Sequence, residues 1–216
     1  MSLEDKVDDK QSKGFIKKAL TLGWKLGMAG LTTAISAPYV GITGIAVGGA
    51  LAAGGAIGGL MKKQSLYDLV SEALTTYSAV NAVIAPIVAL GDATFPLINN
   101  ATLFGKAART LYATTAYNAA FVASYRGAEH LVDNYMNPVG ITKTMSDNFY
   151  NRWKRTGLGF LPGYALVANE VPKLWDISHF AWNALPWGIY DKLKPLPEPK
   201  KHEHAPGLAP AFAAAH

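Results

Sequence analysis

The sequence predicts an all-α fold: a multi-pass transmembrane bundle of about four helices rich in small residues, with an extended, mostly irregular C-terminal arm. Three observations lead to this prediction. Hydrophobic residues make up 50% of the 216 residues, and only 16% are charged, below the quarter that is usual for soluble domains. Apolar segments of about twenty residues recur along the chain. Glycine or alanine recurs at four-residue spacing within them.

The first helix is expected over residues 15–37, and Pro38 is expected to break it. Lys25 is the only charge in the apolar part of this segment. A lysine there either extends its long side chain to the membrane surface or faces a polar partner inside the bundle. Because the next apolar segment, 39–61, follows at once, the two helices are expected to form a hairpin.

The second segment carries the strongest signal. Its core, "GITGIAVGGALAAGGAIGGLMKK" over residues 41–63, has no charge before Lys62 and Lys63. A helix of this length covers roughly 30 Å, the thickness of a hydrocarbon core. In water each glycine would cost the helix about 1 kcal/mol, whereas in lipid small residues let another helix approach closely. The predicted helix-packing face consists of Gly44, Gly48, Ala52 and Ala56.

Two further helices are expected. Residues 64–75 have an amphipathic helical pattern that runs into the apolar stretch 76–98. Pro86 lies inside that stretch, and a proline is tolerated in a membrane helix. Residues 105–125 are the fourth candidate, with small residues on one face and tyrosines that suit a membrane interface.

The chain divides into four parts by composition. Residues 1–14 form a polar N-terminal segment, and 15–130 form the transmembrane bundle. Residues 131–191 are aromatic, rich in turn residues and broken by prolines, which predicts an interfacial or partner-binding extension. Residues 192–216 are a low-complexity tail. Candidate anchors to lipid or to a partner are Trp175, Trp182 and Trp187.

No enzyme chemistry is predicted, and therefore no catalytic residue, cofactor or metal site. The chain has no cysteine. The run "GLGFLP" at 157–162 has Pro162 where a dinucleotide fingerprint needs a glycine. Glu129, His130 and Asp133 can share one helix face, but a solvated helix end explains them better than an acid–base pair.

The positive charge predicts membrane partners. The formal net charge is +5, and the lysines flank apolar segments instead of gathering into one stripe. Membrane lipids, anionic ones among them, are therefore expected partners, and nucleic acid is not. The polar start of the chain contains Glu4, Asp8 and Asp9, which argues against a cleaved secretory or mitochondrial leader.

Two stretches resemble a known family: "AGLTTAISA" (29–37) and "GKAARTLYATTAYNAAFVASYRGAEH" (105–130). With these, residues 15–130 resemble the mitochondrial inner-membrane translocase channel superfamily, particularly the related accessory membrane subunit of respiratory complex I. The resemblance implies a non-catalytic accessory subunit in the mitochondrial inner membrane, whose partners are the other subunits of the complex. After residue 130 the chain departs from the compact form of that family.

Two alternatives stay open. In the first, the chain is a small membrane channel or translocase subunit whose polar path is lined by Lys25, Asn81, Asp92 and Arg109. In the second, it is a peripheral membrane-associated helical protein, which a mean hydropathy of only +0.13 permits.

Overall fold

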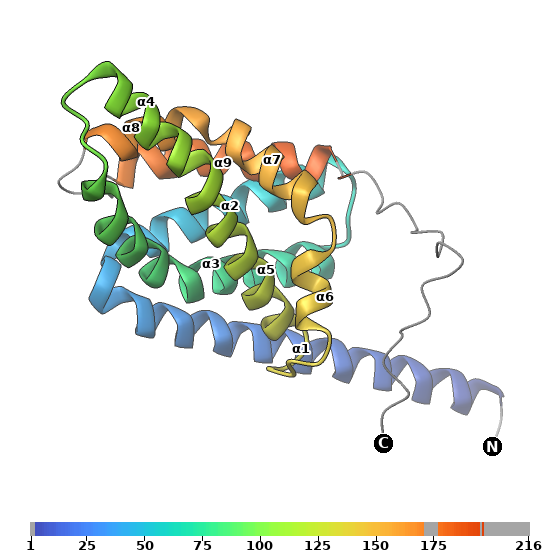
Figure 1. Cartoon of the computed structure of the whole chain (residues 1–216). Coiled ribbons are helices and arrows are strands. Elements are labelled where there is room, and N and C mark those ends of the chain that lie inside the picture. Colours follow the sequence, from blue (N-terminus) through green and yellow to red (C-terminus); the bar gives the residue numbers. More distant parts are fainter. Residues whose placement is uncertain (1–2, 171–176, 195, 197–216) are drawn as a thin grey trace, which may run out of the picture.

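The computed structural model describes residues 3–170, 177–194 and 196, and these residues are almost entirely helical, without a β-strand (Figure 1). The predicted all-helical fold is confirmed. The elements are α1 (Leu3–Val40), α2 (Ile42–Met61), α3 (Leu66–Thr94), the 3₁₀ turn η1 (Phe95–Leu97), α4 (Leu103–Tyr112), the π-helical turn η2 (Ala113–Tyr117), α5 (Asn118–Asp133), α6 (Ile141–Ser146), α7 (Phe149–Gly159), α8 (Leu161–Glu170) and α9 (Ile177–Leu193).

The predicted break at Pro38 occurs three residues later. Helix α1 continues through Pro38 to Val40, because a proline in the last turn removes only one backbone hydrogen bond. Gly41 then ends the helix: its N–H still donates to Ala37 O at 2.8 Å, but its φ of +57° is a conformation that favours glycine. Helix α2 starts at the next residue and turns back (Figure 1).

Helix α2 is packed on two sides through glycines. An added Cβ at Gly48 would lie 2.8 Å from Asn81 Nδ2 of α3. On another side, an added Cβ at Gly54 would lie 2.2 Å from the carbonyl oxygen of Leu185 in α9. Small residues therefore bring backbone close to backbone, as in tightly packed membrane helices.

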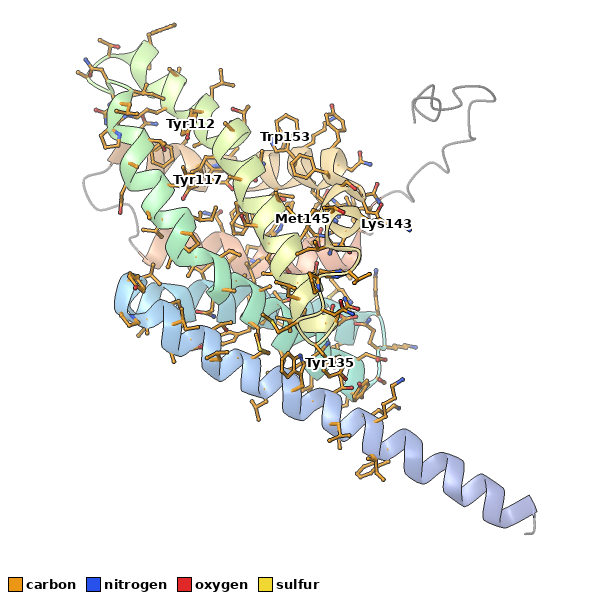
Figure 2. The ribbon with its side chains drawn as sticks, turned by 60° about the horizontal axis from the view of Figure 1, so that its bottom comes forward. Tyr112, Tyr117, Tyr135, Lys143, Met145 and Trp153 are labelled. Atoms are coloured by element: carbon orange, nitrogen blue, oxygen red, sulfur yellow. The ribbon has the colours of Figure 1, made fainter. Side chains whose placement is uncertain are left out.

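Helices α4, η2 and α5 form one continuous helix that contains a π-helical turn (Figure 2). Trp153 of α7 donates from Nε1 to Thr115 O at 2.9 Å, an oxygen that also accepts from the backbone N–H of Asn118. In return Asn118 Nδ2 donates to Trp153 O at 2.8 Å. The π turn therefore fixes α7 against the bundle.

The predicted irregular C-terminal arm is not confirmed, because residues 141–146, 149–159, 161–170 and 177–193 are helical. Pro162 lies in the first turn of α8, where a missing N–H costs nothing. Helix α9 runs parallel to α2 and belongs to the bundle. It is held there by its contact with α2, which lies about 130 residues earlier in the chain.

Two segments are long and apolar enough to cross a membrane by length and composition, Gly44–Met61 and Leu66–Leu97, each with a mean hydropathy of 1.6. The first corresponds to α2 and the second to α3 with η1. A buried core helix of a soluble protein can pass this test too, so the two segments are weak evidence for membrane association. Helix α1 does not pass the same test, because the polar side chains on its inner side lower its mean hydropathy.

Removing the Tyr117 hydroxyl group tests how tightly the core between α3 and η2 is packed. Tyr117 is buried and donates to Ile87 O at 3.0 Å. We expect Tyr117→Phe to lower the free energy of unfolding by about 1 kcal/mol, since it removes one buried hydrogen bond and strands no donor. Thermal unfolding in a neutral detergent measures the change. Tyr39→Phe is the control, because Tyr39 is exposed, and equal effects of the two would contradict the packing.

Candidate functional site

A charged cleft of about 740 Å³ opens at the end of the bundle where α2 ends and α3 begins. This volume falls within the usual range of ligand pockets. The wall combines the C-terminal halves of α2 and α9, the N-terminal half of α3, residues along α5 and α7, and Lys25 of α1. The ionisable groups in its wall are Lys25, Lys62, Glu72, Arg126, Glu129, Asp133, Arg152, Arg155, Asp191 and Lys192.

Each acidic group in the wall has a basic partner. Lys25 Nζ lies 2.7 Å from Asp133 Oδ1, and Arg155 Nη1 lies 2.9 Å from Asp191 Oδ1. The other two pairs are Arg126–Glu129 and Lys192–Glu72. Six basic side chains thus face four acidic ones, and the cleft keeps an excess of positive charge.

Lys25 is the most deeply buried charge of the cleft. Its Nζ also contacts the hydroxyl of Ser71 at 2.8 Å, and Asp133 in turn accepts from Thr75 Oγ1 at 2.8 Å. Of the two possibilities left open for Lys25, the structure shows the polar partner. The network joins α1, α3 and the end of α5.

Two arginines retain buried donors without a partner. The Nε atoms of Arg126 and Arg152 are both inaccessible to solvent and make no hydrogen bond. Burial lowers the pKa of Arg126, and the nearby charge of Arg152 lowers it further. Within the part of the chain that the structure describes, no carboxylate forms an ion pair with Arg152.

The inner wall of the cleft is apolar and aromatic. It contains Leu51, Phe121, Phe160 and Trp187. The first three of these also line a small apolar pocket of about 20 Å³ deeper in the bundle. The cleft therefore offers positive charge at its mouth and hydrocarbon at its base, a pattern that suits an amphiphilic ligand.

Helix α1 has its polar side chains inside and its apolar side chains outside. Lys25, Thr33 and Ser36 point to α3, where they meet Ser71, Tyr77 and Asn81, respectively. Between residues 19 and 40, every exposed residue of α1 is apolar, a glycine, Pro38 or Tyr39. The exposed large hydrophobic side chains of α1 are Phe15, Ile16, Leu20, Leu26, Leu31, Ile35 and Tyr39.

The four predicted helix-packing residues lie on α2 and differ in their surroundings. Gly44 and Gly48 face Asn81 of α3, while Ala52 is buried and Ala56 is half-buried. Gly54 and Gly58, which are not among the four predicted residues, face α9, and the approach at Gly54 is closer than at Gly44 or Gly48. Their own four-residue spacing was the available signal.

Of the three candidate anchors, Trp187 packs inside the protein. Its ring lies 5.3 Å from that of Phe160 and covers Gly159. Trp175 lies outside the described residues, and so does the side chain of Trp182.

The polar residues proposed to line one path lie apart. Only Lys25 belongs to the charged cleft. Asn81 is buried between α1 and α3, where its Oδ1 accepts from Ser36, and Asp92 is exposed. Arg109 is buried elsewhere in the bundle, with Nη1 donating to Ala168 O at 3.2 Å.

Glu129, His130 and Asp133, which share one helix face, do not act as one group either. Glu129 and Asp133 each pair with a cation of the cleft, while His130 contacts Thr144 Oγ1 at 2.8 Å and Val139 O at 3.0 Å. The histidine thus holds the α5–α6 connection. Tyr135 in the same connection packs on Trp24 of α1 (Figure 2).

Comparisons of the chain with family models, with curated proteins and with solved structures find no match. The resemblance to the translocase channel superfamily stays a prediction.

Proposed function

We propose that the chain is a non-catalytic accessory subunit of a membrane complex, held in lipid by α1, α2 and α3. The sequence resemblance makes the mitochondrial inner membrane the proposed location and respiratory complex I the proposed assembly. In this role the packed helices support neighbouring subunits, and the protein carries out no reaction of its own.

The outer surface of α1 is the observation that carries the proposal. From residue 19 to residue 40 it presents no charge to the outside, over a length of about 33 Å. That length is sufficient for a hydrocarbon core of roughly 30 Å. A surface like this in water is a large exposed apolar patch, whereas in lipid or against a membrane subunit it is favourable.

The polar inner side of α1 supports the same proposal. Polar side chains of membrane helices face the bundle interior, where they bond to neighbouring helices. Thr33 Oγ1 and Tyr77 OH are 2.9 Å apart, and Ser36 Oγ lies 3.3 Å from Asn81 Oδ1. The channel alternative has less support, because its four polar residues do not share a cavity.

Single-cysteine labelling tests the membrane location, since the natural chain has no cysteine. Leu31→Cys on the outer side of α1 should react with a membrane-impermeant maleimide only after detergent denaturation. Ser65→Cys is the matched exposed control beyond α2 and should react in membranes opened by freeze–thaw, where both faces are reachable. Equal labelling of the two variants, with release of the protein by carbonate, would overturn the membrane proposal.

A native gel of source membranes in mild detergent, followed by mass spectrometry, tests the assembly. We expect the chain in a very large band together with respiratory subunits. A small homo-oligomeric band would contradict the accessory role and favour the channel.

A further inference from the structure

We propose that the charged cleft binds a phosphate-class oxyanion between Arg126 and Arg152, and that this anion is the head-group phosphate of an anionic phospholipid. The choice of a lipid rests on the proposed membrane location. The oxyanion site itself stands on the cleft alone.

The charge balance of the cleft calls for an anion. The four acidic side chains of the wall are each engaged by a cation, and Arg152 has no acidic partner among the described residues. Arg126 and Arg152 line the same cleft, and the positive charge of Arg152 lowers the pKa of Arg126. A bound dianion or monoanion would turn the repulsion between these two charges into two attractions.

The donor groups suit a phosphate. Arg126 and Arg152 both line the cleft, and among the described residues no carboxylate pairs with Arg152. The Nε atoms of both are covered by protein, so an anion would bind through the outer nitrogens of the guanidinium groups, whose planar fork matches the oxygens of a phosphate. Hydroxyl groups of Thr76 and Thr156 line the same cleft and can add neutral donors.

The surroundings favour a phosphate with acyl chains over a free one. Leu51, Phe121 and Trp187 form the apolar wall below the charges. Lys25 also lines the cleft and belongs to the part of α1, residues 19–40, whose outer side is apolar. Basic pockets between membrane helices bind anionic head groups.

Thermal unfolding of the full chain in a neutral detergent tests the site, with the five tryptophans as the fluorescent probe. Phosphatidylglycerol, phosphatidylcholine and inorganic phosphate are added separately. We expect phosphatidylglycerol to raise the Tm of the natural chain, and the other two to leave it unchanged. Arg152→Gln should bind phosphatidylglycerol about tenfold more weakly, the loss of one charge-assisted contact.

Two further variants make the result specific. Lys106→Gln removes one exposed charge of α4, away from the cleft, and should respond to phosphatidylglycerol like the natural chain. Arg152→Lys keeps the charge but loses the planar fork, so its affinity should fall between those of the natural chain and Arg152→Gln. Without lipid, Arg152→Gln should unfold at the same or a higher temperature, because it removes an unpaired charge.

Each of the other outcomes would overturn one part of the proposal. Equal stabilisation by inorganic phosphate would retain the oxyanion site and overturn the phospholipid. Equal responses of Arg152→Gln and Lys106→Gln would overturn the site and leave general surface attraction. A lower Tm of Arg152→Gln without any anion would make Arg152 structural. The labelling of Leu31→Cys reports separately on the membrane location.

Discussion

Gly54→Ala is expected to destabilise the bundle by about 3 kcal/mol or more, although it adds a single methyl group. The added Cβ would lie 2.2 Å from Leu185 O, 3.1 Å from Gly188 Cα and 3.1 Å from Ile189 N. All three atoms are backbone atoms of α9, so no side-chain rotation can make room. Helix α9 would have to move away from α2.

The neighbouring residue provides a matched control. An added Cβ at Gly55 has nothing within 4 Å, and alanine is the better helix former by about 1 kcal/mol in water. Gly55→Ala is therefore expected to leave the Tm unchanged or to raise it. The measurement is thermal unfolding of both variants in the same detergent. If their Tm values agree, α9 does not lie against α2 as described.

A third glycine should give an intermediate result. At Gly48 the nearest atom is Asn81 Nδ2, at 2.8 Å, which belongs to a side chain that can shift. We expect a smaller loss for Gly48→Ala than for Gly54→Ala. The graded series connects the sequence pattern to the actual contacts, because all three glycines belong to one apolar run.

The helices themselves were predictable from local sequence. The expected segments 39–61 and 105–125 correspond to α2 and to the continuous helix of α4, η2 and α5, and the amphipathic stretch from 64 runs into the next apolar one as α3. The length of an apolar segment and its helical periodicity are local properties, so the helices can be predicted from them without knowing the tertiary contacts. The π turn at η2 left no such local signal.

The C-terminal helices were missed because their stability is not local. Helix α9 has a proline in its sequence, Pro186, and its contact surface is the glycine face of α2. The turn-rich composition of 131–191 predicted an irregular arm. Gly188 lets the backbone of α2 approach closely, and this role cannot be recognised without knowing that α2, far away in the sequence, is the partner of α9.

The charged cleft was also not predictable as a site. Arg152 and Arg155 belong to the run "NRWKRTG", which looks like a solvated basic segment. Burial and the choice of partners depend on six helices, α1, α2, α3, α5, α7 and α9, meeting around the cleft. Helix α1 gave one missed signal: Lys25, Thr32 and Ser36 recur at intervals of seven and four, the spacing of a single helix face.

The two halves of the Lys25–Asp133 pair are expected to respond unequally to removal. Asp133→Ala leaves the ammonium group of Lys25 without its counter-charge, and the Lys25 side chain is only 9% exposed. Removing one partner of a buried pair typically costs 3–5 kcal/mol, so we expect a loss of about 3 kcal/mol. The remaining acceptors, Ser71 Oγ at 2.8 Å and Ser71 O at 3.4 Å, are neutral and supply little compensation.

Lys25→Met should cost about 1 kcal/mol, because the carboxylate it leaves behind can be hydrated: the Asp133 side chain is 45% exposed and still accepts from Thr75. The double variant should recover most of what Asp133→Ala loses, since the stranded charge is then gone. Thermal unfolding of the natural chain, both single variants and the double variant closes the cycle. Equal losses for the two single variants would show that Lys25 reaches water, and the inward polar side of α1 would then need a different explanation.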